Sequence, residues 1–215
     1  ASSRFGTMNE LKELIDTAAD LGYDVLSITN HDRLTFTPEL EAYARQRGIL
    51  LIPGIELTVG RKHVLLLNYR GGKHKIKRLE DLALLDDEVA IIAPHPYYPG
   101  KQSLNSRLAY HRQLFHAAEY CHFYFRGVNP NRRLLRNAQK WGLPLVGSSD
   151  THYLSQLGIT YSLVSSEKTV PAVIDAIKNG KVEVITRPLT IREGLATLKK
   201  VFVHQGIHGF LRWVG

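Results

Sequence analysis

The chain has 215 residues, which is enough for one well-packed domain or at most two small ones. Hydrophobic residues make up 44% and charged residues 22%, and no apolar run approaches the roughly 20 residues of a membrane span. The single cysteine excludes an internal disulfide and a cysteine-rich zinc site, and the net charge of +8 favours anionic partners. With no secretory signal visible, we expect a cytoplasmic protein.

The first half of the chain predicts alternating helices and strands. Apolar positions at helical spacing predict a helix over residues 7–21, and Thr7 with Glu10 forms a capping-box pattern at its start. Thr37-Pro38 and Gly48 mark the start and end of a second helix. The predicted strands here are residues 25–29, 49–52, 63–67 and 89–93, and a charged helix is predicted from about Lys75.

The second half continues this alternation. Helices are predicted over residues 104–116, 131–141 and 171–178, and strands over residues 117–125, 144–147, 159–164 and 182–185. Regular alternation of strands and helices favours a parallel sheet or barrel. We expect an α/β barrel domain over residues 1–188.

The tail, residues 189–215, is predicted to be helical and to pack on the barrel, with a dimer or membrane-surface contact as the alternative. Its apolar residues are Val201, Phe202, Phe210, Leu211, Trp213 and Val214. His204 and His208 lie four apart, which pairs them on a helix, but Gly206 between them disfavours that helix.

Histidines and carboxylates recur where predicted strands end. His31, Glu56 and His95 each follow an apolar strand, and Asp150 and His152 follow another. His63 is the exception, because it begins its strand. Side chains at the carboxyl ends of barrel strands converge on one rim, and imidazole with carboxylate suits Zn, Mn or Fe. A lone histidine is usually a hydrogen-bonded core residue, but the recurrence of this pattern favours a metal site.

Other conspicuous residues have simpler explanations. Cys121 is expected to be a buried strand cysteine, although a ligand or nucleophile role is the alternative. The basic runs at residues 73–78 and 132–136 are expected to be solvated helix faces, with anion binding as the alternative.

Taken in order, these segments resemble the polymerase and histidinol phosphatase (PHP) family of metal-dependent phosphoesterases. The matching motifs are Thr29-Asn30-His31-Asp32, Gly54-Ile55-Glu56, His63, Pro94-His95-Pro96 and Ser149-Asp150-Thr151-His152. Residues 119–122 resemble the family's Glu-x-x-Asn strand, and Gly158 also fits. The resemblance covers residues 1 to about 190.

The resemblance implies a distorted (β/α)7 barrel with two or three divalent metals, and hydrolysis of phosphate esters by metal-activated water. It implies that Glu56 bridges two metals, that Glu56, Asp150 and His152 carry the catalysis, and that the terminal ligands are His31, His63, His95, Asp150 and His152. The family's first strand, His-x-His, has no counterpart in this chain and is expected upstream of Ala1. Asn30 stands where the family usually has Asp, and His122 where Asn is usual.

The expected substrate is a small phosphomonoester. Lys101, Arg107, Arg126 and His122 are candidates for binding it, because cations near a phosphate stabilise developing charge. His122 and Tyr97 are candidates for the general acid. One alternative is a nucleotide or nucleic-acid phosphodiesterase of the exonuclease type. The other is a non-catalytic regulatory module with an incomplete metal site.

Overall fold

The computed structural model describes residues 5–71, 76–197 and 199. Its helices are α1 (Met8–Asp20), α2 (Pro38–Gln46), α3 (Ser106–His111), α4 (Asn131–Trp141) and α5 (Val170–Lys178). Short 3-10 helices lie at Leu79–Leu84, Arg112–Leu114 and Leu154–Gln156. The strands are β1 (Val25–Ile28), β2 (Leu50–Val59), β3 (Lys62–Leu67), β4 (Ala90–Ala93), β5 (Ala117–Cys121), β6 (Leu145–Ser148), β7 (Thr160–Val164) and β8 (Val182–Thr186).

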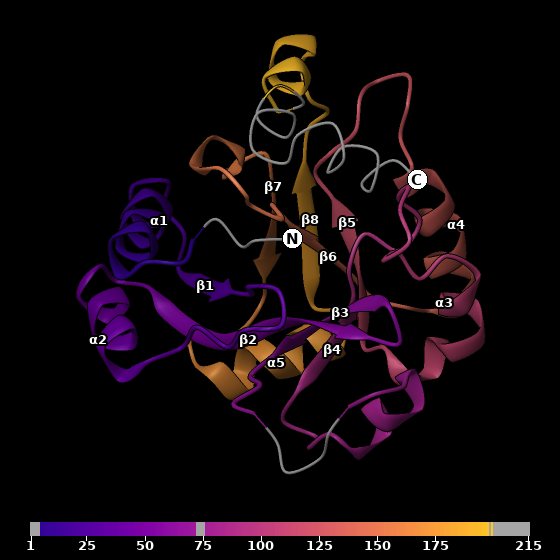
Figure 1. The fold of residues 1–215 in the computed structure, drawn as a ribbon, viewed down its shortest axis with the longest axis horizontal. Helices are drawn as coiled ribbons and strands as arrows, with labels where there is room; N and C mark the ends of the chain where they lie inside the picture. The colour runs from indigo at the N-terminus through magenta and orange to yellow at the C-terminus, as the bar shows by residue number, and fades with distance from the viewer. Residues whose placement is uncertain (1–4, 72–75, 198, 200–215) are drawn as a thin grey trace.

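Six strands form one curled sheet in the order β1-β2-β3-β4-β5-β6, and β7 and β8 form a separate antiparallel pair. Strands β1–β2, β4–β5 and β5–β6 pair in parallel. Figure 1 shows α1 and α2 outside the sheet near its β1 end and α3 and α4 outside it near β5. The fold is therefore mixed α/β with a curled, half-barrel sheet.

The prediction of a parallel sheet is wrong for β3, which runs antiparallel to both β2 and β4. The reason is a tight turn at Gly60 and Arg61, whose φ values are 53° and 68°. Two consecutive positive φ values define the turn that joins adjacent antiparallel strands in a hairpin. Strand β2 therefore folds back directly into β3, without a crossover helix.

Several predicted boundaries are also wrong. The charged helix predicted from Lys75 is only the 3-10 segment Leu79–Leu84, in which Leu79 and Leu82 alone are buried. The helix predicted over residues 104–116 divides into α3 and a 3-10 turn. Strand β5 ends at Cys121, because the Asn131 side chain binds the Cys121 N–H at 3.1 Å and its C=O at 2.9 Å. These contacts replace those of a neighbouring strand.

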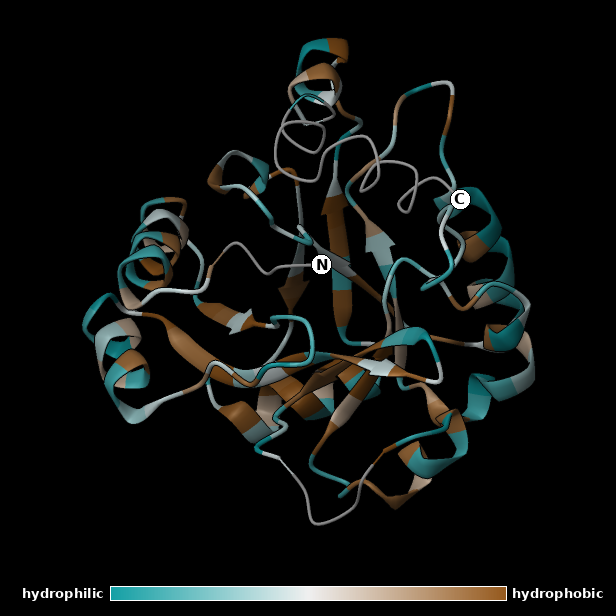
Figure 2. Ribbon diagram, viewed as in Figure 1, coloured by the Kyte–Doolittle hydropathy of each residue, from teal (hydrophilic) through white to brown (hydrophobic). Residues whose placement is uncertain are grey.

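Apolar side chains hold the helices against the sheet. Helix α1 buries Leu11, Leu14, Ile15 and Ala18, and the predicted capping box between Thr7 and Glu10 is confirmed. Figure 2 shows hydrophobic residues concentrated along the strands, whereas the outer faces of α2 and α4 are hydrophilic. Within the described residues, every helix is too short or too polar to traverse a lipid bilayer.

The tail begins against the loop that follows β5. Leu189 is buried and its N–H donates to the carbonyl of Tyr124 at 2.8 Å, and residues 191–197 are helical. A Cβ at Gly194 would lie 2.4 Å from the Phe125 ring, so glycine permits this close approach. The apolar residues predicted to pack from Val201 onward, and His204 and His208, lie outside the described residues. The division into a barrel domain and a tail stays a prediction.

Candidate metal centre

Three strand segments bring His31, Glu56 and His63 together. His31 follows β1 and forms a parallel bridge with Glu56 of β2. In the β2–β3 hairpin, His63 pairs with Thr58. Because residues two apart share a face of a strand, Glu56 and Thr58 point the same way, and His63 is a diagonal neighbour of Glu56. Glu56 was predicted to follow a strand, but it lies inside β2, which continues past β1 to pair with β3.

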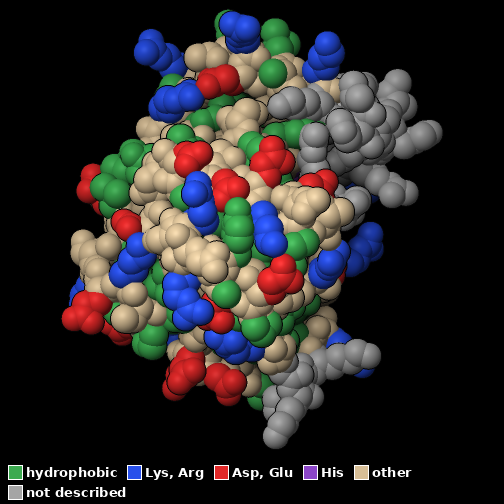
Figure 3. Space-filling view, turned by 90° about the vertical axis from the view of Figure 1, so that its left-hand side faces the viewer, with side chains coloured by type: hydrophobic (Ala, Val, Ile, Leu, Met, Phe, Trp, Pro, Cys, Tyr) green, Lys and Arg blue, Asp and Glu red, His purple; other side chains and the backbone are tan. Residues whose placement is uncertain are grey.

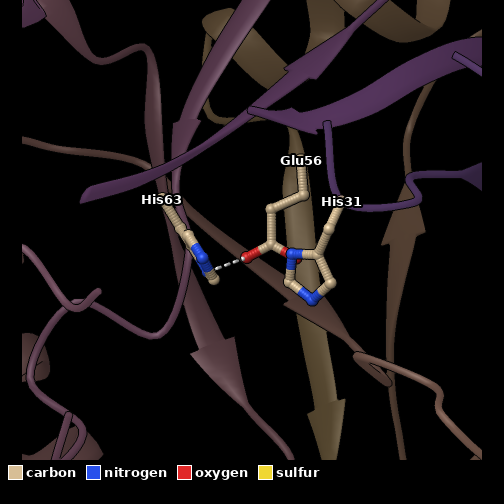
Figure 4. Close-up of side chains that lie close together, drawn as sticks. All are labelled: His31, Glu56 and His63. Carbon is tan, nitrogen blue, oxygen red and sulfur yellow. Dashed lines mark ion pairs between the residues drawn. The ribbon is translucent and has the colours of Figure 1, made fainter. Parts of the chain in front are cut away.

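The Glu56 carboxylate lies at the centre of three imidazoles. His63 Nδ1 is 2.8 Å from Oε1 of Glu56, and His31 Nδ1 is 3.2 Å from Oε2. Figure 4 shows these two rings on either side of the carboxylate. His95, which follows β4, places Nε2 3.3 Å from Oε1.

The donor atoms fit a divalent metal. One ligand atom from each of His31, Glu56 and His63 lies within 4.8 Å of the other two. Nδ1 of His31 and of His63 is buried and faces the Glu56 carboxylate at 3.2 and 2.8 Å, but among the described residues neither atom has a partner in hydrogen-bond geometry. Buried polar atoms are costly without a partner, and two imidazoles with one carboxylate form a typical ligand set for Zn, Mn or Fe.

Electrostatics keep Glu56 ionised. Burial opposes ionisation, but contacts with His63 and His95 outweigh it and hold the pKa of Glu56 below its usual range. Burial lowers the pKa of His95, but the negative charges of Glu56 and Asp150 outweigh burial and raise this pKa above its usual value. Burial lowers the pKa of His31. The centre is therefore an anionic carboxylate beside imidazoles, of which His95 holds a proton in the absence of metal and would release it on becoming a ligand.

Asp150 and His152 lie beside this group, in the loop after β6. The His31 and His152 ring centroids are 6.1 Å apart, and Nδ1 of His152 is 3.7 Å from Oδ1 of Asp150. Asp150 has a φ of 39°, a backbone conformation that Asp and Asn tolerate better than most residues. The loop thus adds a carboxylate and an imidazole next to His31, although its atoms are not within the compact group around Glu56.

The two candidates for the general acid have other contacts. His122 is buried, and its Nε2 is 3.3 Å from Nε2 of Gln156. The hydroxyl of Tyr97 accepts a hydrogen bond from Asn137 at 2.6 Å, and the guanidinium of Arg133 lies 4.5 Å from its ring centroid. Tyr97 is therefore directed toward α4.

The predicted phosphate-binding cations are exposed. Lys101 lies in the loop after His95, Arg107 on α3 and Arg126 in the loop after Phe125. None of the three lines the cavity that the candidate ligands share. In the second basic run, Arg132, Arg133 and Arg136 are exposed on α4, as a solvated helix face requires. Cys121 is buried, and burial raises the pKa of its thiol.

Two buried residues support the loops of the site. Oε1 of Gln156 accepts the N–H groups of His152 and Tyr153, both at 2.8 Å. Glu119 accepts the N–H of His95 at 2.7 Å and the hydroxyl of Ser148. Burial and Asp150 raise the pKa of Glu119 to about 7. Gln156 carries no sequence signal of its own, whereas Glu119 lies in the recognised Glu-x-x-Asn-like segment.

A cavity of about 270 Å³ extends from the candidate ligands into the fold. Its walls come from β1, β6, β7 and α5, and they include Ile28, Val146, Val164, Val173 and Ile177. Among the described residues β1 pairs with β2 alone, and β6 with β5 alone. The backbone N–H and C=O of Gly147 in β6 instead contact the hydroxyl of Ser162, both at 2.9 Å.

The fold and the site together define a mixed α/β protein with a histidine and carboxylate cluster at the rim of a curled sheet. Residues 128–182, which include Asp150 and His152, match the family model described as PHP-associated. This match confirms the resemblance to the PHP family over these residues. The comparison with curated proteins found no match.

A solved structure shares this fold. PsfC from Pseudomonas syringae PB-5123 is 17% identical, with a TM-score of 0.61 over 91% of this chain and 89% of that chain. A protein from Bifidobacterium adolescentis ATCC 15703, provisionally named a metal-dependent phosphoesterase, is 16% identical. Its TM-score is 0.48 over 66% of this chain and 82% of that chain. At 17% identity the likeness to PsfC concerns the fold alone.

Proposed function

We propose that the protein hydrolyses phosphate monoesters with divalent metal ions, Mn or Zn, held by His31, Glu56, His63, His95, Asp150 and His152. The observation that carries this proposal is the convergence of three imidazoles on the ionised carboxylate of Glu56. A small phosphorylated metabolite in the cytoplasm is the expected substrate.

The candidate ligands form two groups with different roles. His31, Glu56 and His63 hold the first ion. The buried Nδ1 atoms of the two histidines donate lone pairs to it. Asp150 and His152, at the more exposed side of His31, hold a second ion or face the substrate. A bound divalent metal polarises the phosphoryl group and lowers the pKa of water.

The proposal includes the closed (β/α)7 barrel and its first strand. The cavity between β1 and β6 has apolar walls and adjoins His31 and Asp150. Because exposed strand edges favour pairing, an added strand beside β1 would extend the sheet toward β6, where Ser162 of β7 now contacts the backbone of Gly147. The expected His-x-His strand would then place its imidazoles beside the present ligands.

Two alternative functions predict different results. A nucleic-acid phosphodiesterase would need a continuous basic surface. On the one side of the molecule that Figure 3 shows, basic and acidic side chains are interspersed. A regulatory module would bind metal or ligand without turnover. Strong loss of substrate affinity with added salt favours the first alternative, and metal binding without hydrolysis of any phosphoester favours the second.

The experiment is hydrolysis of small phosphomonoesters by purified protein after chelation and after reloading with Mn²⁺ or Zn²⁺. We expect activity only after reloading, and greater activity and metal content in a form extended upstream of Ala1. Turnover that resists chelation would refute the metal mechanism. Equal metal content and rate in the two forms would refute the role of the first strand.

A further inference from the structure

Glu119 lies on β5 and links the ends of both neighbouring strands. Its side chain is buried, with 2% of the residue exposed. Oε2 accepts the backbone N–H of His95, which follows β4, at 2.7 Å. Oε1 accepts the hydroxyl of Ser148, the last residue of β6. One carboxylate therefore contacts the two loops that carry His95 and Asp150.

The backbone of His95 needs such support. Its φ of 29° is positive, which is costly for a residue with a Cβ. The ladder between β4 and β5 ends at Ala93, so regular pairing does not extend to His95. Its ring nevertheless reaches Glu56 through Nε2 at 3.3 Å. The hydrogen bond to Glu119 fixes the strained peptide group from which this ring projects.

Stability alone does not explain a carboxylate in this position. Within the described residues, the hydrogen bonds of its side chain go to His95 and Ser148, and no Lys or Arg forms an ion pair with it. Burying a carboxylate away from water is costly, so this side chain stabilises the fold less than an ordinary buried residue. A role in orienting the site accounts for its presence.

We propose that Glu119 is a positioning residue that sets the orientation of His95 and of the loop carrying Asp150, and thereby the metal affinity of the centre. This inference rests on the proposed metal site and adds a residue that does not itself bind metal. Partners that orient metal ligands typically contribute about 10–100-fold to metal affinity or activity.

Two substitutions separate position from charge. In Glu119→Gln, the amide oxygen can accept the N–H of His95 and the amide NH₂ can donate to the hydroxyl of Ser148, so both contacts survive without the charge. Glu119→Leu removes both contacts and keeps a similar volume. Glu183→Leu, on the exposed side of β8, is the matched control.

The test is calorimetric titration of each purified protein with Mn²⁺, together with a thermal melt in chelator. We expect Glu119→Leu to bind Mn²⁺ about 10–100-fold more weakly. Glu119→Gln and Glu183→Leu should bind like the wild type. Wild-type affinity in Glu119→Leu would overturn the inference, and so would equal losses in the Gln and Leu variants. If Glu119→Leu does not fold, Ser148→Ala should show a smaller loss, and an unchanged affinity there would overturn the inference.

Exchange of the His95 amide hydrogen gives a second readout that needs no metal. We expect slow exchange in the wild type and in Glu119→Gln, and fast exchange in Glu119→Leu. Fast exchange in the wild type would overturn the positioning role. If the wild type binds no Mn²⁺, the proposed function fails, and amide exchange still decides whether Glu119 holds this backbone.

Discussion

Replacing Asp150 with Asn should separate the chemistry of the site from the stability of the fold. Asp150 lies in the loop after β6 with a φ of 39°, which Asn also tolerates, so the backbone should be kept. The change removes one negative charge and leaves the size of the side chain nearly constant. Any loss of activity can then be assigned to the missing carboxylate.

The cost in stability follows from the contacts of Asp150. Its side chain is 29% exposed, and that of its ion-pair partner, His152, is 39% exposed. Nδ1 of His152 lies 3.7 Å from Oδ1 of Asp150. Because both side chains are partly exposed, solvent screens this pair, which contributes about 0–1 kcal/mol. For a domain of this size, about 1 kcal/mol corresponds to a change in Tm of roughly 2–4 °C. Loss of a group that orients a metal ligand typically lowers activity about 10–100-fold. Turnover should fall by at least this much.

The assay pairs a thermal melt in chelator with phosphomonoester turnover in saturating Mn²⁺. We expect a Tm within a few degrees of the wild type and turnover reduced at least tenfold, on the scale of lost metal-site interactions. A metal-free variant that unfolds far below the wild type would make Asp150 a structural residue. Unchanged turnover in a well-folded variant would remove Asp150 from the catalytic group.

Two further predictions concern the fold. Gly147→Ala should lower the free energy of unfolding by about 1–3 kcal/mol in urea titration, an overpacking cost. The reason is that a Cβ there would lie 2.6 Å from the carbonyl oxygen of Tyr161. Gly127→Ala, with nothing within 4 Å, should be neutral, and equal effects would refute this packing. His116 accepts the N–H of Ile91 through Nδ1, and burial lowers its pKa from 6.5. Its stabilising contribution is therefore complete above about pH 6.5 and is lost as pH falls toward the lowered folded pKa. His116→Asn should flatten this part of the stability profile, and an unchanged profile would contradict it.

The sequence predicts the elements well where a local pattern determines them. The capping box of Thr7 and Glu10 and the apolar face of α1 are local features, and both are observed. The direction of β3 was missed, because Gly60 and Arg61 form a hairpin turn that strand alternation does not reveal. The early end of β5 depends on Asn131, ten residues further along, so no local pattern predicts it.

The site shows the same division. The recurrence of histidines and carboxylates after strands predicts a cluster, and the structure brings His31, His63 and His95 to Glu56. The sequence places Glu56 after a strand, because the apolar run ends before it, whereas pairing with β3 extends β2 through it. The support from Gln156 depends on how the loop folds back on itself, which no local sequence pattern predicts.

The central claim is that His31, Glu56 and His63 hold a divalent metal. Crystals of the protein soaked with Zn²⁺ and measured on both sides of the zinc absorption edge test it directly. We predict an anomalous peak for a zinc ion bound by Glu56 and by the imidazole nitrogens of His31 and His63. Density confined to other residues, or a well-ordered site without density at saturating Zn²⁺, would contradict the claim.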